Sequence, residues 1–458
     1  MKWLEYYPAI SYFTNVYITM EKAAPQHPSF REALLFWLKL GLISFGGPAG
    51  QIAIMHEYLV EKKKWISESK FLHALNYCMI LPGPEAQQLA TYNGWLLHGV
   101  KGGLAAGILF ILPSVFILLG LSFVYVTFGE TPVLNSILDF LKPAVVAIVI
   151  LALLKIAKKS LVTPIHYILA SLAFCCIYFL NVPFPLIVFG AISIGAISIH
   201  FVPKVFEVNI KKEEFQKNNE TFYVVNQNSI LAGSGFSIKR LAFQIIGGLF
   251  LWCAPLVIIY WTAIVDFNFW KQLSLFFTKA AFVTFGGAYA VLPYVAQVSV
   301  ETYGWLTKLQ MIDGLALGET TPGPLIMVLA FVGFMAGYNS FTGNIGMATL
   351  GLGLTTYYTF LPSFLFIFVG APLIERTQSN TYLKTLFGFA TAAVTGVILN
   401  LGIYFGKAVI IPSPPTVLWI PLAWTIISFI ALRYLKINMI VWIGLSMIIG
   451  LLDFLVYH

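Results

Sequence analysis

The sequence predicts an all-α, polytopic membrane protein. Of its 458 residues, 59% are hydrophobic and only 10% are charged, whereas a soluble domain has about 25% charged residues. A chain with so much apolar side-chain surface cannot hide it in a core and still present a wetted exterior. We therefore expect a multi-pass integral protein of the cell membrane, in contact with the lipid bilayer.

Several apolar stretches support this fold class. Gly103–Val126 and Leu241–Trp261 are long enough to cross a bilayer core of about 30 Å, which takes a helix of about 20 residues. Ala144–Leu154, Tyr167–Leu180 and Val417–Leu432 are shorter and need their flanking residues to span. Tryptophan and tyrosine lie near many of the ends, as interfacial anchors do.

Two parts of the chain repeat one pattern, which indicates an internal duplication. "LKLGLISFGGPAGQIA" (Leu38–Ala53) matches "TKAAFVTFGGAYAVLP" (Thr278–Pro293). Four landmarks share one ungapped offset of 240 residues: Phe45-Gly46-Gly47 with Phe285-Gly286-Gly287, Lys39 with Lys279, Trp65 with Trp305, and Pro82-Gly83-Pro84 with Pro322-Gly323-Pro324. Further along, Leu112–Ser114 matches Leu361–Ser363 at an offset of 249, so the second copy has gained nine residues.

The duplication divides the chain into five parts: an N-terminal segment (1–32), a first membrane half (33–201), a polar cytoplasmic linker (202–240), a connecting transmembrane helix (241–262) and a second membrane half (270–458). One connecting span predicts that the second half is inverted. Positive residues favour cytoplasmic loops, and the loop after the first Phe-Gly-Gly holds Lys62, Lys63, Lys64 and Lys70, whereas its counterpart holds only Lys308. Inverted repeats are typical of secondary transporters, whose substrate site lies between the repeats near mid-membrane.

Two threading models remain open. If every apolar segment crosses, the chain has about thirteen spans, and several lysine clusters fall on conflicting sides. Alternatively, Ala33–Met55 and Phe71–His98 enter and return as helical hairpins that turn at Gly46-Gly47-Pro48 and Pro82-Gly83-Pro84. Each arm of about 11 residues then reaches mid-membrane at 1.5 Å per residue, and the lysine clusters of the first half share the cytoplasmic side.

The Pro-Gly-Pro motifs predict interrupted helices. Proline lacks an N–H and clashes with the preceding turn, so Pro82 and Pro84 free the carbonyls of Cys78 and Ile80. Unpaired backbone is not tolerated in lipid, so such a break faces protein or a water-filled cavity. The helix that follows presents free amides, those of Glu85, Ala86 and Gln87 in the first copy and of Leu325, Ile326 and Met327 in the second. Helix N-termini of this kind bind anions; the alternative is that the motifs are packing kinks, which are common in membrane helices.

Four charged residues accompany these breaks. Glu85 and Glu319 flank them, and buried acids in membranes are usually functional. A protonatable carboxylate could couple proton movement to anion movement, although Glu85 could also simply cap a first turn. Lys39 and Lys279 are candidate counter-charges for an anion, or else they snorkel to the membrane interface.

At these motifs the chain closely resembles the chromate ion transporter family, in its long form with two fused domains. The residues that carry the resemblance are "FGGPAGQIAIMHEYLVEKKKWIS", "LPGPEAQQLATYNGW", "VTFGGAYAVLPYV" and "GETTPGPLIMVLAFVGF". The resemblance implies a membrane carrier that exports chromate or takes part in transport of the related sulfate. Asn93, Ala288 and the 202–240 linker depart from the family pattern, which leaves the substrate preference open.

The expected function is therefore transport of a small oxyanion. An anion channel is the alternative, and oligomeric state is left open. The sequence has no nucleotide-binding P-loop and no metal-ligand spacing among its seven histidines, so we expect a carrier driven by an ion gradient, with the proton as a candidate coupling ion. We expect no enzyme activity, no cofactor and no nucleic-acid partner. The candidate substrate-binding residues are Lys39, Gly46, Gly47, Pro48, Pro82, Gly83, Pro84, Glu85, Gln87, Gln88, Lys279, Gly286, Gly287, Glu319, Thr320, Thr321, Pro322, Gly323 and Pro324.

Overall fold

A computed structural model describes residues 26–45, 47–129, 131–201, 222–226, 229, 238–262, 266–374 and 381–457. Within these ranges the chain is helical, with two isolated β-bridges and no strand. The predicted all-α class is confirmed. Gly46 and most of the 202–240 linker lie outside the described residues.

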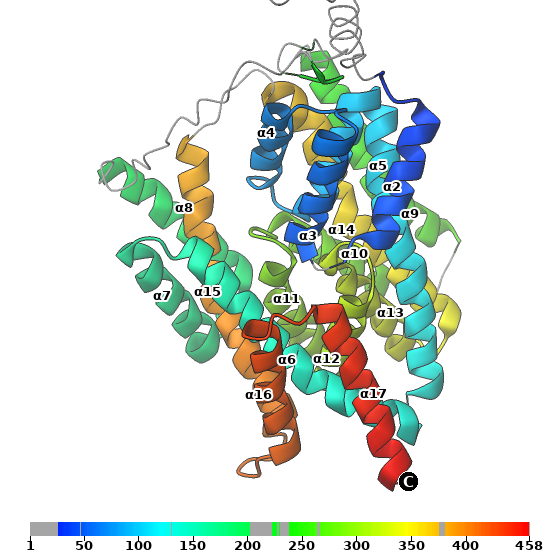
Figure 1. Cartoon of the computed structure of the whole chain (residues 1–458), viewed down its shortest axis with the longest axis vertical. Helices are drawn as coiled ribbons and strands as arrows, with labels where there is room; N and C mark the ends of the chain where they lie inside the picture. The colour runs from blue at the N-terminus through cyan, green and yellow to red at the C-terminus, as the bar shows by residue number, and fades with distance from the viewer. Residues whose placement is uncertain are drawn as a thin grey trace, which may run out of the picture.

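Eight helical segments form the first half (Figure 1): α2 (Phe30–Ile43), α3 (Gly47–His56), η1 (Glu57–Lys62), α4 (Glu68–Cys78), α5 (Glu85–Phe128), α6 (Pro132–Ser160), α7 (Pro164–Leu180) and α8 (Phe184–Phe201). The rest of the described chain forms α9 (Ile238–Trp261), α10 (Phe267–Phe282), α11 (Ala288–Gln297), η4 (Val298–Thr302), α12 (Lys308–Thr320), η5 (Leu325–Met327), α13 (Val328–Ser340), α14 (Ile345–Ile374), α15 (Thr381–Ile410), α16 (Trp419–Arg433) and α17 (Met439–Tyr457). Six of the described helices are long and apolar enough to cross a membrane: α5, α6, α9, α14, α15 and α17.

The short helices of the first half form two hairpins that return to the end where they start. Lys63 follows α3, and its Nζ lies 2.8 Å from the Glu32 carboxylate at the start of α2. His98 Nε2 donates to the Pro28 carbonyl at 3.0 Å, so the second arm of the α4–α5 hairpin ends beside the start of α2. At Gly99, with φ of 61°, α5 breaks and turns back through the whole molecule (Figure 1).

The second half contains the same arrangement. Asn339 Nδ2 donates to the Trp305 carbonyl at 2.8 Å, and the rings of Trp270 and Phe341 stack at 5.3 Å. The start of α10, the turn before α12 and the end of α13 therefore meet at one end. This end is the far one, because Tyr125 near the end of α5 contacts α12 at Asp313.

These contacts favour re-entrant hairpins over thirteen straight crossings. The hairpin arms are single helices of 10 to 16 residues, and at 1.5 Å per residue the longest falls short of the ~30 Å bilayer core. The inverted orientation of the two halves in a bilayer and the five domain boundaries remain predictions.

A short piece of the predicted linker docks on the first half. Val225 N–H donates to the Trp65 carbonyl, and Ser67 N–H donates to the Val225 carbonyl, both at 2.9 Å. This contact places residues 222–226 beside the loop that carries Lys62, Lys63 and Lys64. The described part of the linker therefore lies at the end where the first-half hairpins open.

The outer surface is apolar where helices pack little against their neighbours. On α9, the side chains of Phe250 and Trp261 are 71% and 83% exposed. Large exposed apolar faces of this extent are stable only against lipid or another protein. With the six long apolar helices, they identify a multi-pass integral membrane protein.

The hairpin arrangement predicts which sites share one side of the membrane. In a background without the four native cysteines, single cysteines replacing Lys63 and Lys101 should react with an impermeant maleimide from the same side, because both lie at the end where the first-half hairpins open. A cysteine replacing Lys308 should react only from the other side. Labelling Lys63→Cys and Lys101→Cys from opposite sides would contradict the hairpins.

Candidate functional site

The four helix breaks form two pairs through reciprocal hydrogen bonds between the halves. Gly83 N–H, in the first Pro-Gly-Pro, donates to the Thr284 carbonyl at 2.8 Å. Gly323 N–H, in the second Pro-Gly-Pro, donates to the Ser44 carbonyl at 2.7 Å. Both donors and both acceptors are 240 residues apart, so each half's Pro-Gly-Pro pairs with the residue before the other half's Phe-Gly-Gly.

Side chains bind backbone carbonyls within the two Pro-Gly-Pro breaks. Gln51 Nε2 donates to the Gly323 carbonyl at 2.6 Å and Gln88 Nε2 to the Pro82 carbonyl at 2.7 Å. The Ser114 hydroxyl donates to the Pro322 carbonyl. Because unpaired backbone is not tolerated in a bilayer, these three side chains make the breaks possible at depth.

Buried polar atoms without a partner surround the same breaks. In the part of the chain that the structure describes, these atoms are the hydroxyls of Ser44 and Ser363 and the Oε1 atoms of Gln51, Gln87 and Gln88. All five side chains are at most 1% exposed. Buried polar atoms normally have a partner, so this cluster can receive a hydrophilic guest such as water or an ion.

The two helix starts after the breaks differ. The first helical hydrogen bond of α5 runs from Gln88 N–H to the Pro84 carbonyl at 3.0 Å, and the amides of Glu85, Ala86 and Gln87 precede it as predicted. In the second copy, Met327 N–H donates to the Pro324 carbonyl at 2.9 Å. The prediction of a free Met327 amide is therefore wrong, because the chain tightens into the short helix η5.

The predicted carboxylates lie beside the breaks but are not equivalent. Glu319 is buried at the end of α12, and the Tyr289 hydroxyl at the start of α11 donates to its Oε1 at 2.5 Å. Glu85 is half-buried at the start of α5. At the offset of 240, Glu85 corresponds to Leu325 and Glu319 to Met79. Glu85 therefore follows the first Pro-Gly-Pro, whereas Glu319 precedes the second.

The other predicted residues bond within their own helix, are exposed, or form the turns. Thr320 and Thr321 hydroxyls donate to the Leu317 and Gly318 carbonyls of their own helix, at 2.7 and 2.8 Å. Their protons are thereby occupied, as threonine hydroxyls in helices often are. Lys39 and Lys279 are exposed on α2 and α10, and the structure does not bring them to the breaks. Gly47, Pro48, Gly286 and Gly287 line the turns themselves.

A buried polar cluster near the breaks was not predicted. The Tyr125 hydroxyl on α5 donates to Asp313 Oδ2 on α12 at 2.9 Å. Lys142 Nζ on α6 lies 3.8 Å from Asp313 Oδ1 and 3.2 Å from Asp139. An acid inside the apolar residues 311–318 was the available signal. The repeated Leu-Pro-Ser could have identified Ser114 as a functional residue. Gln51 corresponds to Val291, so no shared pattern pointed to it.

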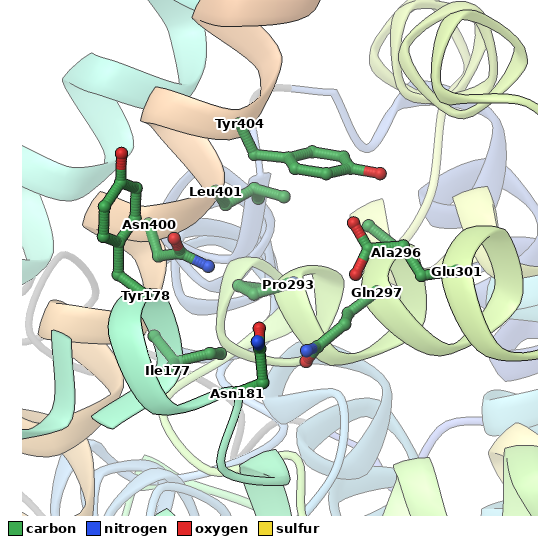
Figure 2. A pocket seen from close by; sticks show the side chains of 10 residues that line it. All are labelled: Ile177, Tyr178, Asn181, Pro293, Ala296, Gln297, Glu301, Asn400, Leu401 and Tyr404. Atoms are coloured by element: carbon green, nitrogen blue, oxygen red, sulfur yellow. The ribbon is translucent and has the colours of Figure 1, made fainter. Parts of the chain in front are cut away.

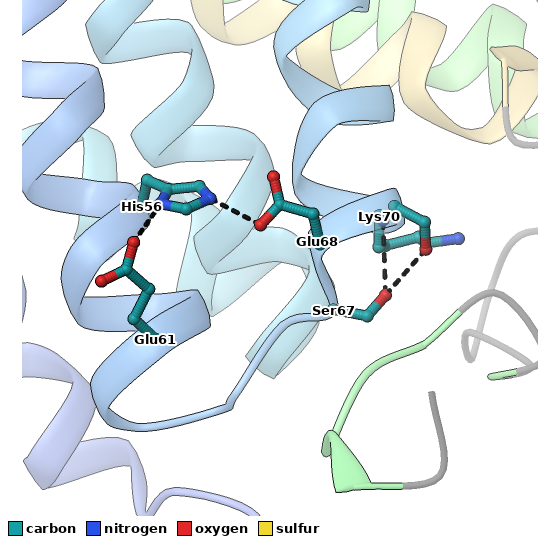
Figure 3. A network of polar contacts seen from close by, with 6 residues as sticks. His56, Glu61, Ser67, Glu68 and Lys70 are labelled. Atoms are coloured by element: carbon teal, nitrogen blue, oxygen red, sulfur yellow. Dashed lines mark hydrogen bonds and ion pairs between the residues drawn. The ribbon is translucent and has the colours of Figure 1, made fainter. Parts of the chain in front are cut away.

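A second polar network lies outside the apolar interior, after the first hairpin (Figure 3). His56 Nδ1 is 3.2 Å from Glu61, and His56 Nε2 is 2.6 Å from Glu68. Nearby, the Lys62 ammonium, 2.6 Å from Glu57, lowers the pKa of that carboxyl through a hydrogen bond and charge attraction. No metal-binding group of three or more ligands occurs among the described residues.

The close packing at the breaks predicts that their glycines cannot be replaced. A Cβ on Gly323 would lie 1.9 Å from Ser114 Oγ, and one on Gly83 would lie 2.6 Å from Ser363 Oγ. Both residues have positive φ, 97° and 122°. Gly323→Ala and Gly83→Ala should each lower stability by about 1–3 kcal/mol, measured as thermal unfolding of the purified protein in detergent.

Gly247→Ala is the matched control, because a Cβ at Gly247 on α9 meets nothing within 4 Å. Alanine in a helix is favoured over glycine by about 0.5–1 kcal/mol, so this variant should be neutral or more stable. Equal melting temperatures for all three variants would contradict the packing described here.

Comparison with known proteins finds transporters of similar sequence and length. A protein described as an uncharacterized transporter of Methanocaldococcus jannaschii is 27% identical over 96% of this chain and 98% of its own length. A chromate transport protein of Cupriavidus metallidurans is 24% identical over 94% of both chains. A chromate transport protein of Pseudomonas aeruginosa is 28% identical over 82% of this chain and 81% of its own. No solved structure matches the chain.

The family model described as "Chromate transporter" matches residues 31–196 and 271–451. These two ranges correspond closely to the two membrane halves and contain all four helix breaks. Together they cover well over half of the chain, and the chain therefore belongs to the chromate transporter family.

Proposed function

We propose that this protein is a secondary transporter that exports a small tetrahedral oxyanion, chromate in the first place, across the cell membrane. The observation that carries this proposal is the reciprocal pairing of the four breaks through Gly83 and Gly323. It gathers helix ends and unpartnered buried polar groups at the contact between two homologous halves, where transporters of this design bind their substrates. The names of the relatives from C. metallidurans and P. aeruginosa support chromate as the substrate.

The chemistry of the breaks suits a dianion without a fixed salt bridge. The first amides of α5 and the dipole of that helix attract negative charge. The Ser44 and Ser363 hydroxyls add neutral donors that are buried nearby. Neutral donors hold an anion and still release it, because no full opposite charge has to be separated when the anion leaves.

Sulfate is the alternative substrate, because chromate and sulfate are both tetrahedral dianions. The shared geometry gives the breaks little means of discriminating between them. Glu85 and Glu319 are proposed as proton-binding groups that couple the anion to a proton gradient. Lys39 and Lys279 are proposed only as outer counter-charges, because both are exposed.

The transport proposal predicts saturable chromate uptake into inverted vesicles that contain the wild-type protein, with competition by sulfate. Gly323→Ala should abolish most of this uptake, because its Cβ collides with Ser114. The measurement is the initial rate of chromate uptake against concentration, with empty vesicles as the control. Flux that rises linearly without saturation would favour a channel, and absence of both chromate and sulfate flux would remove the proposal.

The coupling proposal predicts that Glu319→Gln and Glu85→Gln change the pH dependence of transport. Both variants keep the shape of the side chain but cannot exchange a proton, so transport should lose its response to an imposed pH gradient while the protein still inserts. The control is Glu57→Gln, an exposed acid beside Lys62. A wild-type pH profile in both variants would clear the two carboxylates of this role.

A further inference from the structure

A polar cavity of about 160 Å³ lies between α7, α11 and α15, away from the breaks (Figure 2). Its polar lining consists of the carboxamides of Asn181, Gln297 and Asn400, the phenols of Tyr178 and Tyr404, and the Glu301 carboxylate. Pro293, Ala296, Ile177 and Leu401 complete its walls. Carboxamides and phenols supply hydrogen-bond donors as well as acceptors, so the cavity is equipped for a hydrated or polar guest.

Two lysines stand at the cavity. Lys407 Nζ lies 2.7 Å from the Tyr178 hydroxyl. Lys308 Nζ lies 4.0 Å from Glu301 Oε1 and 4.6 Å from the centre of the Tyr404 ring. Neither lysine is among the lining residues, whose one charged side chain is Glu301. At the rim, the two ammonium groups outnumber this carboxylate.

The repeat shows how this cavity differs from the equivalent place in the first half. At the offset of 240, His56, Glu61 and Glu68 correspond to Ala296, Glu301 and Lys308. In the first half the His56 ring fills the space between two carboxylates. In the second half a methyl group replaces the ring and an ammonium group replaces one carboxylate.

The position of Glu57 also loses a negative charge in the second half, because its counterpart is Gln297, which lines the cavity. The second copy has thus exchanged two acids for an amide and a lysine, and has removed the ring that would fill the space. Both changes open the position and make it more positive. A cavity for a cation would require the opposite change in charge.

One helix, α11, runs from the second Phe-Gly-Gly to the cavity. Its residues Pro293, Ala296 and Gln297 are on α11, whose first residue follows Gly287. The ten residues of α11 span about 15 Å at 1.5 Å per residue. The far end of α11 leads to η4 and to the turn where the second-half hairpins open, so the α11 residues of the cavity lie between the second Phe-Gly-Gly and that turn.

We propose that this cavity is an outer binding site for the transported oxyanion, held by the carboxamides of Asn181, Gln297 and Asn400, with Lys308 and Lys407 at its rim. This inference rests on the proposed function. Glu301 limits the affinity, because its carboxylate competes with the anion for Lys308. The outer site collects the anion at one end of the carrier, and the breaks form the inner site.

The test measures binding of radiolabelled sulfate to the purified full chain in lipid nanodiscs, with chromate as competitor. The wild type should bind two anions per chain. Lys407→Gln should weaken one of the two sites by about tenfold, and Glu301→Gln should tighten the same site by about fivefold to tenfold, as expected for one charge a few ångströms away in a partly wetted site.

The matched controls are the register counterparts in the first half. Glu61→Gln corresponds to Glu301→Gln at the offset of 240, and Lys158→Gln corresponds to Lys407→Gln at the offset of 249. Neither control residue lines the cavity, so both variants should bind sulfate as the wild type does. Unchanged melting temperatures of the four variants exclude a general loss of folding.

The outcomes separate this inference from the proposed function. A single site that neither Lys407→Gln nor Glu301→Gln affects would overturn the outer site, while saturable chromate flux would still support the transporter. Weaker sulfate binding in Glu301→Gln would also overturn it, because removing a carboxylate from an anion site should tighten binding. No binding and no flux of either anion would remove both proposals.

Discussion

The structure depends on one requirement, that every backbone polar group inside a bilayer must find a partner within the protein. Pro82 and Pro84, and their counterparts Pro322 and Pro324, interrupt helices inside the protein. The resulting groups are paired across the duplication, since Gly83 donates to Thr284 and Gly323 donates to Ser44. Gln88 satisfies the Pro82 carbonyl from within its own half, but the amides of Gly83 and Gly323 each bind an acceptor from the other half. The two membrane halves are therefore one folding unit, in which each copy completes the interrupted helix of the other.

The two breaks are not held with equal strength. At Gly323 the first half contributes the Ser44 carbonyl, the Gln51 amide and the Ser114 hydroxyl. At Gly83 the second half contributes the Thr284 carbonyl, while Gln88 belongs to the same half as the Pro82 carbonyl that it binds. A buried hydrogen bond contributes about 0.5–1.5 kcal/mol net. Separating the halves at Gly323 consequently costs more than separating them at Gly83, which makes the Gly83 side the easier one to open.

Sequence reasoning predicted the positions of the breaks and missed most of their partners, for a physical reason. Proline and glycine act on their own turn, so a short window suffices to predict an interruption at Pro82-Gly83-Pro84, and the offset of 240 extends this to Pro322-Gly323-Pro324. The carbonyl that Gly83 reaches is 201 residues away in the chain, and no local pattern encodes it. Comparison of the repeats finds only what the copies share. Gln51, which corresponds to Val291, and Asp313, which corresponds to His73, were missed because they belong to one copy alone.

The residues that differ between the copies are the ones that can give a carrier direction. A duplication that kept all its polar residues would present the same environment to an anion from both ends. The first copy instead closes its position with His56 between two acids, while the second opens the matching position beside Lys308 and Gln297. The carboxylates at the breaks diverge likewise, with Glu85 after one Pro-Gly-Pro and Glu319 before the other. The shared motifs therefore account for how the helices are interrupted, and the unshared charges account for why the two ends of the protein are chemically different.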